Sequence, residues 1–136
     1  MEEKKPAVDI KVRSRGFTGF CGLEFFEIQD EGCTIRCRLR PEHLNPAGIA
    51  HGGLIATLTD VAAGTMALQA DGGRHNIVTQ SCNIHFLRPG AGEVLFGKSR
   101  VIRKGSRVCV VAVDCVDESG TLVAASTYEI AYLGER

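Results

Sequence analysis

The stretch from Leu54 to Leu68, LIATLTDVAAGTMAL, contains small and apolar residues with a single charged side chain, Asp60. A segment that is apolar on nearly every side predicts a buried helix. A carboxylate on such a helix loses its hydration, so it needs a partner, a raised pKa or a function. The tripeptide His51-Gly52-Gly53 is typical of a helix start, and Asp71-Gly72-Gly73 is typical of a helix end. We therefore expect one helix over about 51–70.

Strands are expected on both sides of this helix. Residues 33–40 alternate regularly, with Cys33, Ile35 and Cys37 on one face and polar side chains on the other, which predicts a half-buried antiparallel strand. One helix and about six strands predict an α+β fold with an antiparallel sheet. Either the sheet curls around the apolar helix or a second copy of the chain covers it. We expect an N-terminal arm over 1–15 and a single domain over 16–136. Further strands are expected at about 20–29, 76–86, 93–103, 107–116 and 121–132, separated by turns rich in Gly, Pro, Ser or Asp.

The composition excludes several classes of function. The chain has 136 residues with 16 basic and 16 acidic side chains, so its formal net charge is zero. This balance predicts no binding to nucleic acid or to an anionic membrane. The first six residues, MEEKKP, lack the apolar core of a signal peptide, and the helix is too short and too rich in Ala, Thr and Gly to span a bilayer. We therefore expect a cytoplasmic protein.

The cysteines and histidines predict neither disulfides nor a metal site. The six cysteines include no CxxC spacing, and Cys109 and Cys115 lie among valines, so they are interpreted as reduced, buried apolar residues. The four histidines show no recognised metal-ligand spacing. No metal or separate cofactor is expected.

The helix start has the chemistry of an anion site. The first N–H groups of a helix lack intrahelical acceptors, and the helix dipole makes that end positive. Gly52 and Gly53 allow a ligand atom to approach the backbone closely, so a carbonyl oxygen that becomes an oxyanion would fit there. The alternative is that the tripeptide is only a turn into the helix.

Asp60 and Gly52 are too far apart on one helix to act together. Eight residues separate them, which corresponds to a rise of about 12 Å. A base and an oxyanion donor must both lie within about 3 Å of the reacting groups. If both act on one carbonyl, the site is shared by two antiparallel helices of a homodimer, which then carries two sites. The alternative is a structural Asp60 that caps a local hydrogen bond or pairs with an arginine.

Two segments carry a resemblance to a known family. Residues 45–60, NPAGIAHGGLIATLTD, and residues 83–89, NIHFLRP, resemble the hotdog-fold acyl-CoA thioesterases of the phenylacetate-degradation type. The resemblance covers about 20–133. It implies a curved antiparallel sheet wrapped around one long helix, a homodimer formed by strand pairing, and possible association of two dimers into a homotetramer. It also implies an acyl-CoA substrate, with coenzyme A as part of that substrate.

The resemblance implies a role for each catalytic candidate. Asp60 is expected as general base or nucleophile, and the Gly52 N–H, helped by Asn45, as the group that polarises the thioester carbonyl. His51 is expected to hold the helix start, and Thr79 to orient water or Asp60. Thr79 can also be interpreted as an ordinary exposed strand residue. The chain departs from some relatives at Gly64, where they carry a hydroxyl that Thr79 or Thr65 would have to replace.

Substrate-binding candidates lie in the same motifs and in a basic turn. Basic side chains near the sheet edge would bind the phosphates of coenzyme A, although they are also typical of solvated turns. The N-terminal phenylalanines, Phe17, Phe20, Phe25 and Phe26, are candidates for the acyl pocket. The substrate-binding candidates are Gly53, Phe86, Arg88, Arg103, Lys104, Gly105 and Ser106.

The expected reaction is hydrolysis of an acyl-CoA thioester, with Asp60 activating water or attacking directly to form a mixed anhydride. A second possibility is a non-catalytic acyl-CoA sensor or carrier that uses the same groove. A third is a hydratase or dehydratase, which generally needs a different arrangement of histidine and acid. The acyl group itself is not predicted.

Overall fold

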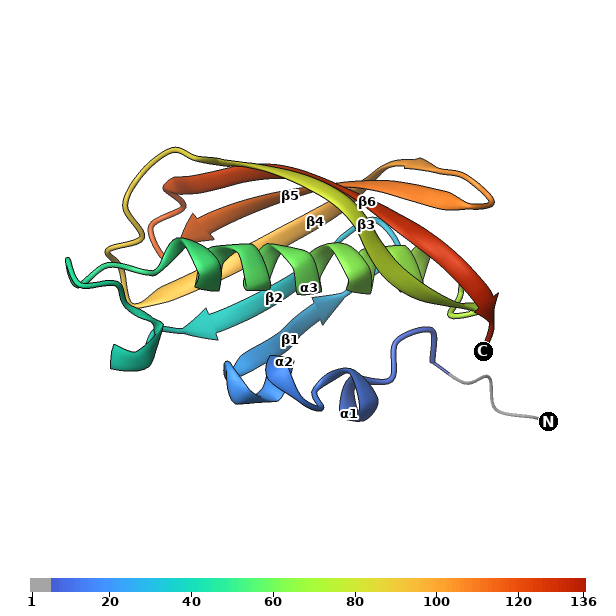
Figure 1. Cartoon of the computed structure of the whole chain (residues 1–136), viewed down its shortest axis with the longest axis horizontal. Helices are drawn as coiled ribbons and strands as arrows, with labels where there is room; N and C mark the ends of the chain where they lie inside the picture. The colour runs from blue at the N-terminus through green and yellow to red at the C-terminus, as the bar shows by residue number, and fades with distance from the viewer. Residues whose placement is uncertain (1–5) are drawn as a thin grey trace.

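A computed structural model describes residues 6–136. These residues form one six-stranded sheet and one long helix (Figure 1). The helix α3 spans Gly52–Ala70, as the sequence predicts. Two four-residue helices precede the sheet, α1 (Ile10–Arg13) and α2 (Phe17–Phe20), and a short 3-10 helix, η1, spans Pro41–His43. The strands are β1 (Leu23–Ile28), β2 (Cys33–Arg38), β3 (His75–Phe86), β4 (Val94–Lys104), β5 (Val108–Asp117) and β6 (Leu122–Glu135).

The strand order is β1-β2-β4-β5-β6-β3, and every neighbouring pair is antiparallel. The chain leaves β2, forms α3 and then returns to the far edge of the sheet as β3. The sheet curves around α3, with β3 and β6 arching over it (Figure 1). The expected α+β fold, a curved antiparallel sheet wrapped around one central helix, is confirmed.

Close packing fixes α3 against the sheet. Gly97 on β4 lets the helix approach, because a Cβ at that position would lie 3.3 Å from Leu58 Cγ. Two tyrosines of β6 hold the helix with their hydroxyl groups: the Tyr128 hydroxyl lies 2.6 Å from Thr59 Oγ1, and Tyr132 donates to the Ala67 carbonyl over 2.7 Å. Burial raises the pKa of Tyr128 to about 12, so this hydroxyl keeps its proton at physiological pH. The helix therefore has a fixed position beside β6 and β3.

The alternation in β2 is confirmed in part. Cys33, Ile35 and Cys37 are buried in the core and Arg38 is exposed, but Thr34 on the opposite face is also buried and the strand ends at Arg38, before residue 40. Burial raises the pKa of Cys37 to about 11 and that of Cys115 to about 12. All six cysteines lie within the described residues and none forms a disulfide there, so the buried ones serve as small apolar residues.

The N-terminal region differs from the expectation in one respect. A strand was expected from residue 20, but Phe20 belongs to α2 and β1 begins at Leu23, since a turn with Gly22 at φ 69° separates them. Residues 6–15 of the expected arm lie against the domain. Val8 is 5% exposed, and Arg136 donates to the Ala7 carbonyl over 3.1 Å. Residues 1–5 of that arm lie outside the described residues.

Strand β3 is an edge strand that is open to solvent along most of its length. Its apolar side chains include Val78 and Phe86, which are 49% and 56% exposed. Long, exposed apolar edges are uncommon in natural sheets unless another chain covers them. Between residues 6 and 136, no helix is both long enough and apolar enough to cross a membrane.

Candidate active site

The start of α3 leaves one backbone donor available. His51 is the N-cap, and its Nδ1 accepts a 2.8 Å hydrogen bond from the Gly53 N–H. The N–H groups of Leu54 and Ile55 bond to the His51 carbonyl. Among the described residues no acceptor contacts the Gly52 N–H, so this group is free for a ligand. The predicted role of His51 in holding the helix start agrees with this geometry.

Asn45 stabilises the loop before the helix. Its Oδ1 accepts from the Ala47 N–H over 2.9 Å and from the Ile49 N–H over 3.3 Å. Its backbone N–H also bonds to the Ile49 carbonyl. These bonds occupy the side-chain carbonyl, so any help to Gly52 must come from the amide NH2 group of Asn45.

Asp60 lies in the middle of α3 and faces the edge strand. The hydroxyl of Thr79 on β3 donates a 2.6 Å hydrogen bond to Asp60 Oδ1. This contact is the partner that an acid in an apolar helix requires. The predicted burial of the helix does not extend to Asp60 in the single chain, because this face of α3 is not covered by the sheet and Asp60 is half-buried.

Of the two hydroxyl groups that could replace the one missing at Gly64, Thr79 contacts Asp60 and Thr65 does not. The Thr65 hydroxyl is buried and donates to the Val61 carbonyl over 2.7 Å. Gly64 makes room for two other side chains. A Cβ there would lie 3.1 Å from Ile77 Cδ1 and 3.3 Å from Arg13 Nη2.

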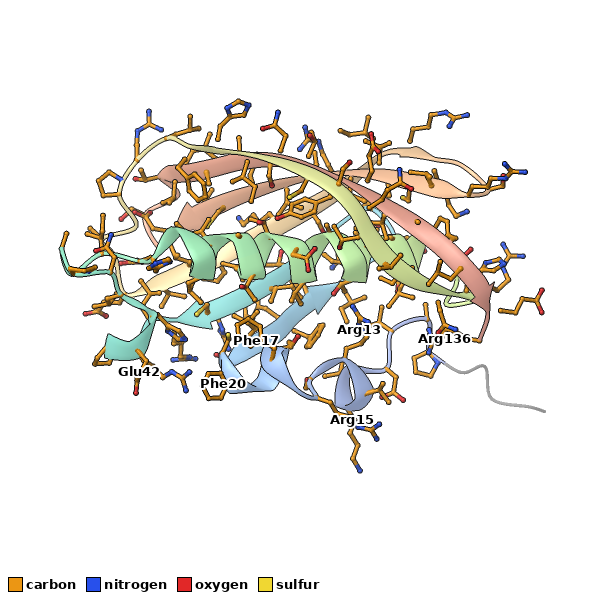
Figure 2. The ribbon with its side chains drawn as sticks, viewed as in Figure 1. Arg13, Arg15, Phe17, Phe20, Glu42 and Arg136 are labelled. Carbon is orange, nitrogen blue, oxygen red and sulfur yellow. The ribbon has the colours of Figure 1, made fainter. Side chains whose placement is uncertain are left out.

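Arg13 is a charged neighbour of Asp60 that the sequence interpretation missed. It points from α1 toward α3, whereas Arg15 points into solvent (Figure 2). Burial lowers the pKa of Arg13, the charge of Arg136 lowers it further, and the charge of Asp60 acts in the opposite direction. Its Nε is buried without a hydrogen-bond partner among the described residues. No sequence signal identifies Arg13, because it is one of several basic residues in an irregular segment.

Two cavities flank the start of α3. The first, which we call the Phe17 cavity, has a volume of about 450 Å³ and is lined by residues of α2, the η1 region and α3 that include Phe17, Phe20, His51, Gly53 and Thr57. The second, the Phe86 cavity, has a volume of about 380 Å³ and is lined by residues that include Gly52, Phe86 and Arg88.

The predicted residues Gly52, Gly53, Phe86 and Arg88 are therefore brought together at one end of the helix. A Cβ at Gly52 would lie 3.5 Å from the Phe86 ring, and Arg88 donates to the Leu122 carbonyl over 2.9 Å.

The basic turn lies at the opposite end of α3. Lys104 Nζ is 3.8 Å from Asp71 Oδ1, at the C-cap, and 4.6 Å from the centre of the Tyr132 ring. The 19 residues of α3 span about 28 Å, so one chain does not bring Arg103, Lys104, Gly105 and Ser106 to Gly52. Their assignment to coenzyme A stays a prediction. Residues 6–136 contain no group of three or more His, Cys, Asp or Glu side chains placed to hold a metal ion.

One chain also keeps Gly52 apart from Asp60, as the helix rise requires. The free N–H and the Thr79-bonded carboxylate lie on the same straight helix, about 12 Å apart. A single copy therefore does not bring the free Gly52 N–H and the Asp60 carboxylate to the same ligand atom.

The curved antiparallel sheet around one helix, with a free N–H at the helix start and an acid along its length, defines the hotdog class. The thioesterase superfamily matches residues 47–124 of this chain, which include both Gly52 and Asp60. The chain belongs to this superfamily and is a thioester hydrolase. The narrower resemblance to the phenylacetate-degradation type stays a prediction.

Relatives and solved structures agree with this membership. The chain is 30% identical over 126 residues to the medium/long-chain acyl-CoA thioesterase YigI of Escherichia coli K12, covering 82% of this chain and 81% of YigI. The protein smu.793 of Streptococcus mutans UA159, solved with acetyl-CoA, is 25% identical, with a TM-score of 0.76 over 84% of this chain and 90% of that one. A hypothetical thioesterase of Streptococcus pneumoniae TIGR4, solved with coenzyme A, is 27% identical, with a TM-score of 0.73 over 84% of this chain and 88% of that one.

Proposed function

We propose that this protein hydrolyses acyl-CoA thioesters to a free acid and coenzyme A, in a site that two subunits share. The observation that carries the proposal is the carboxylate of Asp60, which Thr79 holds on the open face of α3. The free Gly52 N–H supplies the second requirement of the reaction. The acyl-CoA thioesterase YigI and the two relatives solved with coenzyme A or acetyl-CoA support this substrate class.

The residues support a direct hydrolysis. The thioester carbonyl oxygen accepts from the Gly52 N–H at the positive end of α3, which stabilises the charge that develops on that oxygen. Asp60 of the other subunit takes a proton from a water molecule as the water oxygen attacks the carbonyl carbon. The tetrahedral intermediate then collapses, the carbon–sulfur bond breaks, and the proton on Asp60 goes to the leaving thiolate. Thr79 occupies Oδ1 of Asp60, so Oδ2 is the oxygen that accepts the proton.

The geometry of β3 supports the shared site. Ile77 lies at the level of Gly64, Thr79 at the level of Asp60, and Phe86 beside Gly52, so β3 runs antiparallel to α3. The midpoint between Gly52 and Asp60 is about 6 Å from each along the helix. Thr79 and Phe86 mark the levels of Asp60 and Gly52, so this midpoint lies at the middle of the stretch of β3 between these two residues. A two-fold axis there brings Gly52 of one subunit to the level of Asp60 of the other.

The exposure of β3 supports a partner on that edge. A homodimer that pairs β3 with β3 gives both edges hydrogen-bond partners and covers Val78, which is 49% exposed in the single chain. Association of two such dimers into a tetramer is a further expectation that this geometry leaves open.

Asp60→Asn tests the proposal directly. The amide keeps the shape of the carboxylate but cannot accept the proton, so we expect kcat for thiol release from a panel of acyl-CoAs to fall by about 10²–10⁴. Asp114→Asn, a half-buried acid on β5, is the matched control and should retain activity. Activity of Asp60→Asn within a few-fold of the unmodified protein would remove the central assignment.

The same assays separate the remaining alternatives. A single turnover in ¹⁸O-labelled water places label in the Asp60 carboxylate only if the acid attacks directly to form an anhydride. Binding of acyl-CoA without thiol release by the unmodified protein would instead identify a sensor or carrier.

A further inference from the structure

The Phe17 cavity has no role in the proposed reaction so far. Its lining comes from α2, the η1 region and the first turns of α3. In Figure 1, α2 lies on the opposite side of α3 from β5 and β6. The cavity volume of about 450 Å³ is within the range of sites that enclose a whole small ligand. The cavity is therefore much larger than an acetyl group needs.

The lining of this cavity suits an apolar occupant. The lining includes the buried side chains of Leu54 and Cys21 and the exposed rings of Phe17 and Phe20. Figure 2 shows the two rings at α2. The nearby polar groups are already engaged. His43 Nδ1 accepts from the Arg40 N–H over 2.9 Å, and His43 Nε2 lies 2.7 Å from the Cys21 carbonyl.

The lining of the Phe17 cavity has no net formal charge. It contains one arginine, Arg40, and one acid, Glu42, whereas the lining of the Phe86 cavity contains Arg88 and no acid. Arg40 also donates to the Phe20 carbonyl over 2.9 Å and lies 3.3 Å from His43 Nε2. The balance of charge favours an uncharged chain in the Phe17 cavity and an anionic group in the Phe86 cavity.

The two aromatic rings are placed to cover a ligand. Phe17 and Phe20 are 64% and 78% exposed, although large aromatic side chains usually bury most of their area. Their ring centres are 6.2 Å apart with an angle of 23° between the planes. A group placed between two rings needs about 7 Å, two contact distances of about 3.5 Å, so an acyl group would lie along the faces of these rings and not between them.

The cavity is continuous with the helix start. His51 and Gly53, which flank Gly52, line the Phe17 cavity, whereas Gly52 itself lines the Phe86 cavity together with Arg88. A thioester held at the Gly52 N–H therefore has an apolar space on one side and a space with a cation on the other. The acyl chain suits the first, and the coenzyme A portion suits the second.

We propose that the Phe17 cavity binds an apolar acyl chain of medium or greater length, and that Phe17 and Phe20 determine this chain-length preference. The proposal rests on the proposed function, because it requires the thioester carbonyl at the helix start. Each methylene that enters an apolar site contributes about a fourfold gain in kcat/KM. The preference for long over short chains therefore depends on how much of the chain the rings cover.

The test is the chain-length profile of thiol release. We compare butanoyl-, octanoyl- and dodecanoyl-CoA with the unmodified protein, Phe17→Ala, Phe20→Ala and the double variant. The ratio of kcat/KM for dodecanoyl-CoA to that for butanoyl-CoA should fall about tenfold in the double variant. Phe26→Ala removes a ring that is 47% exposed on β1 and contacts Phe96 outside the cavity, and it should leave the ratio unchanged.

A second variant tests the cavity without removing a ring. Thr57→Phe should fill the space between α2 and α3 and should lower the same ratio. An unchanged ratio in both the double variant and Thr57→Phe overturns the proposal. A kcat/KM for phenylacetyl-CoA above that for octanoyl-CoA in the unmodified protein also overturns it.

Two further outcomes separate the explanations. A change in the mass of the assembly in the double variant would show that the rings belong to a contact between copies, which overturns the acyl-chain role. Asp60→Asn tests the proposed function separately. If that variant retains activity, the proposed function fails, but the chain-length ratio can still be measured.

Discussion

At the scale of single residues, the contact between Thr79 and Asp60 is the feature most easily tested. The hydroxyl of Thr79 fixes one carboxylate oxygen at 2.6 Å and so sets the direction of the other. Hydrogen bonds to charged groups contribute about 1.5–3 kcal/mol. Thr79→Val keeps the shape but removes the donor, so we expect kcat for acyl-CoA hydrolysis to fall about tenfold to a hundredfold with little change in KM.

The conservative variant distinguishes positioning from structure. Thr79→Ser retains the hydroxyl and should restore most of the activity. Thr127→Val on β6, another exposed strand threonine, is the matched control and should behave like the unmodified protein. Equal activity in Thr79→Val and the unmodified protein would show that the contact with Asp60 has no part in the reaction.

Single residues also show what a sequence can predict. Asp60 is identifiable because it is the only charge in an apolar helix, and Gly52 because a glycine pair at a helix start exposes backbone donors. Arg13 is not identifiable, because its approach to Gly64 depends on how α1 folds back onto α3. That packing depends on tertiary contacts and leaves no periodic pattern.

At the scale of elements, the C-terminal end of α3 depends on one buried acid. Asp71 is 2% exposed and accepts from the His75 N–H over 2.8 Å and from His75 Nδ1 over 3.1 Å. Burial alone would raise the pKa of Asp71, but the hydrogen bonds from His75 and the charges of His75 and Lys104 lower this pKa below its usual value. Asp71 therefore joins α3, β3 and the β4–β5 turn as a carboxylate.

The lowered pKa gives a prediction for stability against pH. A carboxyl group whose folded-state pKa is below its unfolded value stabilises the fold fully above the unfolded pKa, and this contribution is lost as the pH falls through the folded value. Asp71→Asn should therefore lower the free energy of unfolding by about 1–3 kcal/mol at pH 7. The difference from the unmodified protein should shrink toward pH 3, as measured by denaturant unfolding. Asp114→Asn should show no such pH-dependent difference.

The regular elements follow from local patterns, and the irregular ones do not. Alternation over 33–40 identifies β2 because it has the period of a strand. The apolar run over 54–68 identifies α3 by its length and by the glycine pairs that bound it, since a buried helix is apolar on nearly every side. The four-residue helices α1 and α2 are too short to show a period, so part of α2 was assigned to a strand. The position of the β4–β5 turn at the far end of α3 depends on strand length and register, which composition does not reveal.

At the scale of the whole molecule, the separation of Gly52 and Asp60 makes a shared site testable by mixing two inactive proteins. Gly52→Pro removes the N–H and little else. Position 52 is the first residue of α3, where proline is favourable, and His51 already has the extended conformation that a residue before proline requires. Loss of an oxyanion donor should lower kcat by about 10²–10³. Gly52→Ala keeps the N–H and is the control, since its Cβ would make an ordinary 3.5 Å contact with Phe86.

In a dimer of one Gly52→Pro subunit and one Asp60→Asn subunit, one of the two sites combines the intact Gly52 with the intact Asp60. Unfolding and refolding equal amounts of the two variants together gives about half mixed dimers, so we expect about a quarter of the specific activity of the unmodified protein. Each variant treated in the same way alone should stay inactive. If each active site lay within one chain, the mixture would recover no activity, because every subunit lacks either the Gly52 N–H or the Asp60 carboxylate. Absence of recovery, with mixed dimers verified by differently tagged subunits, would therefore contradict the shared site.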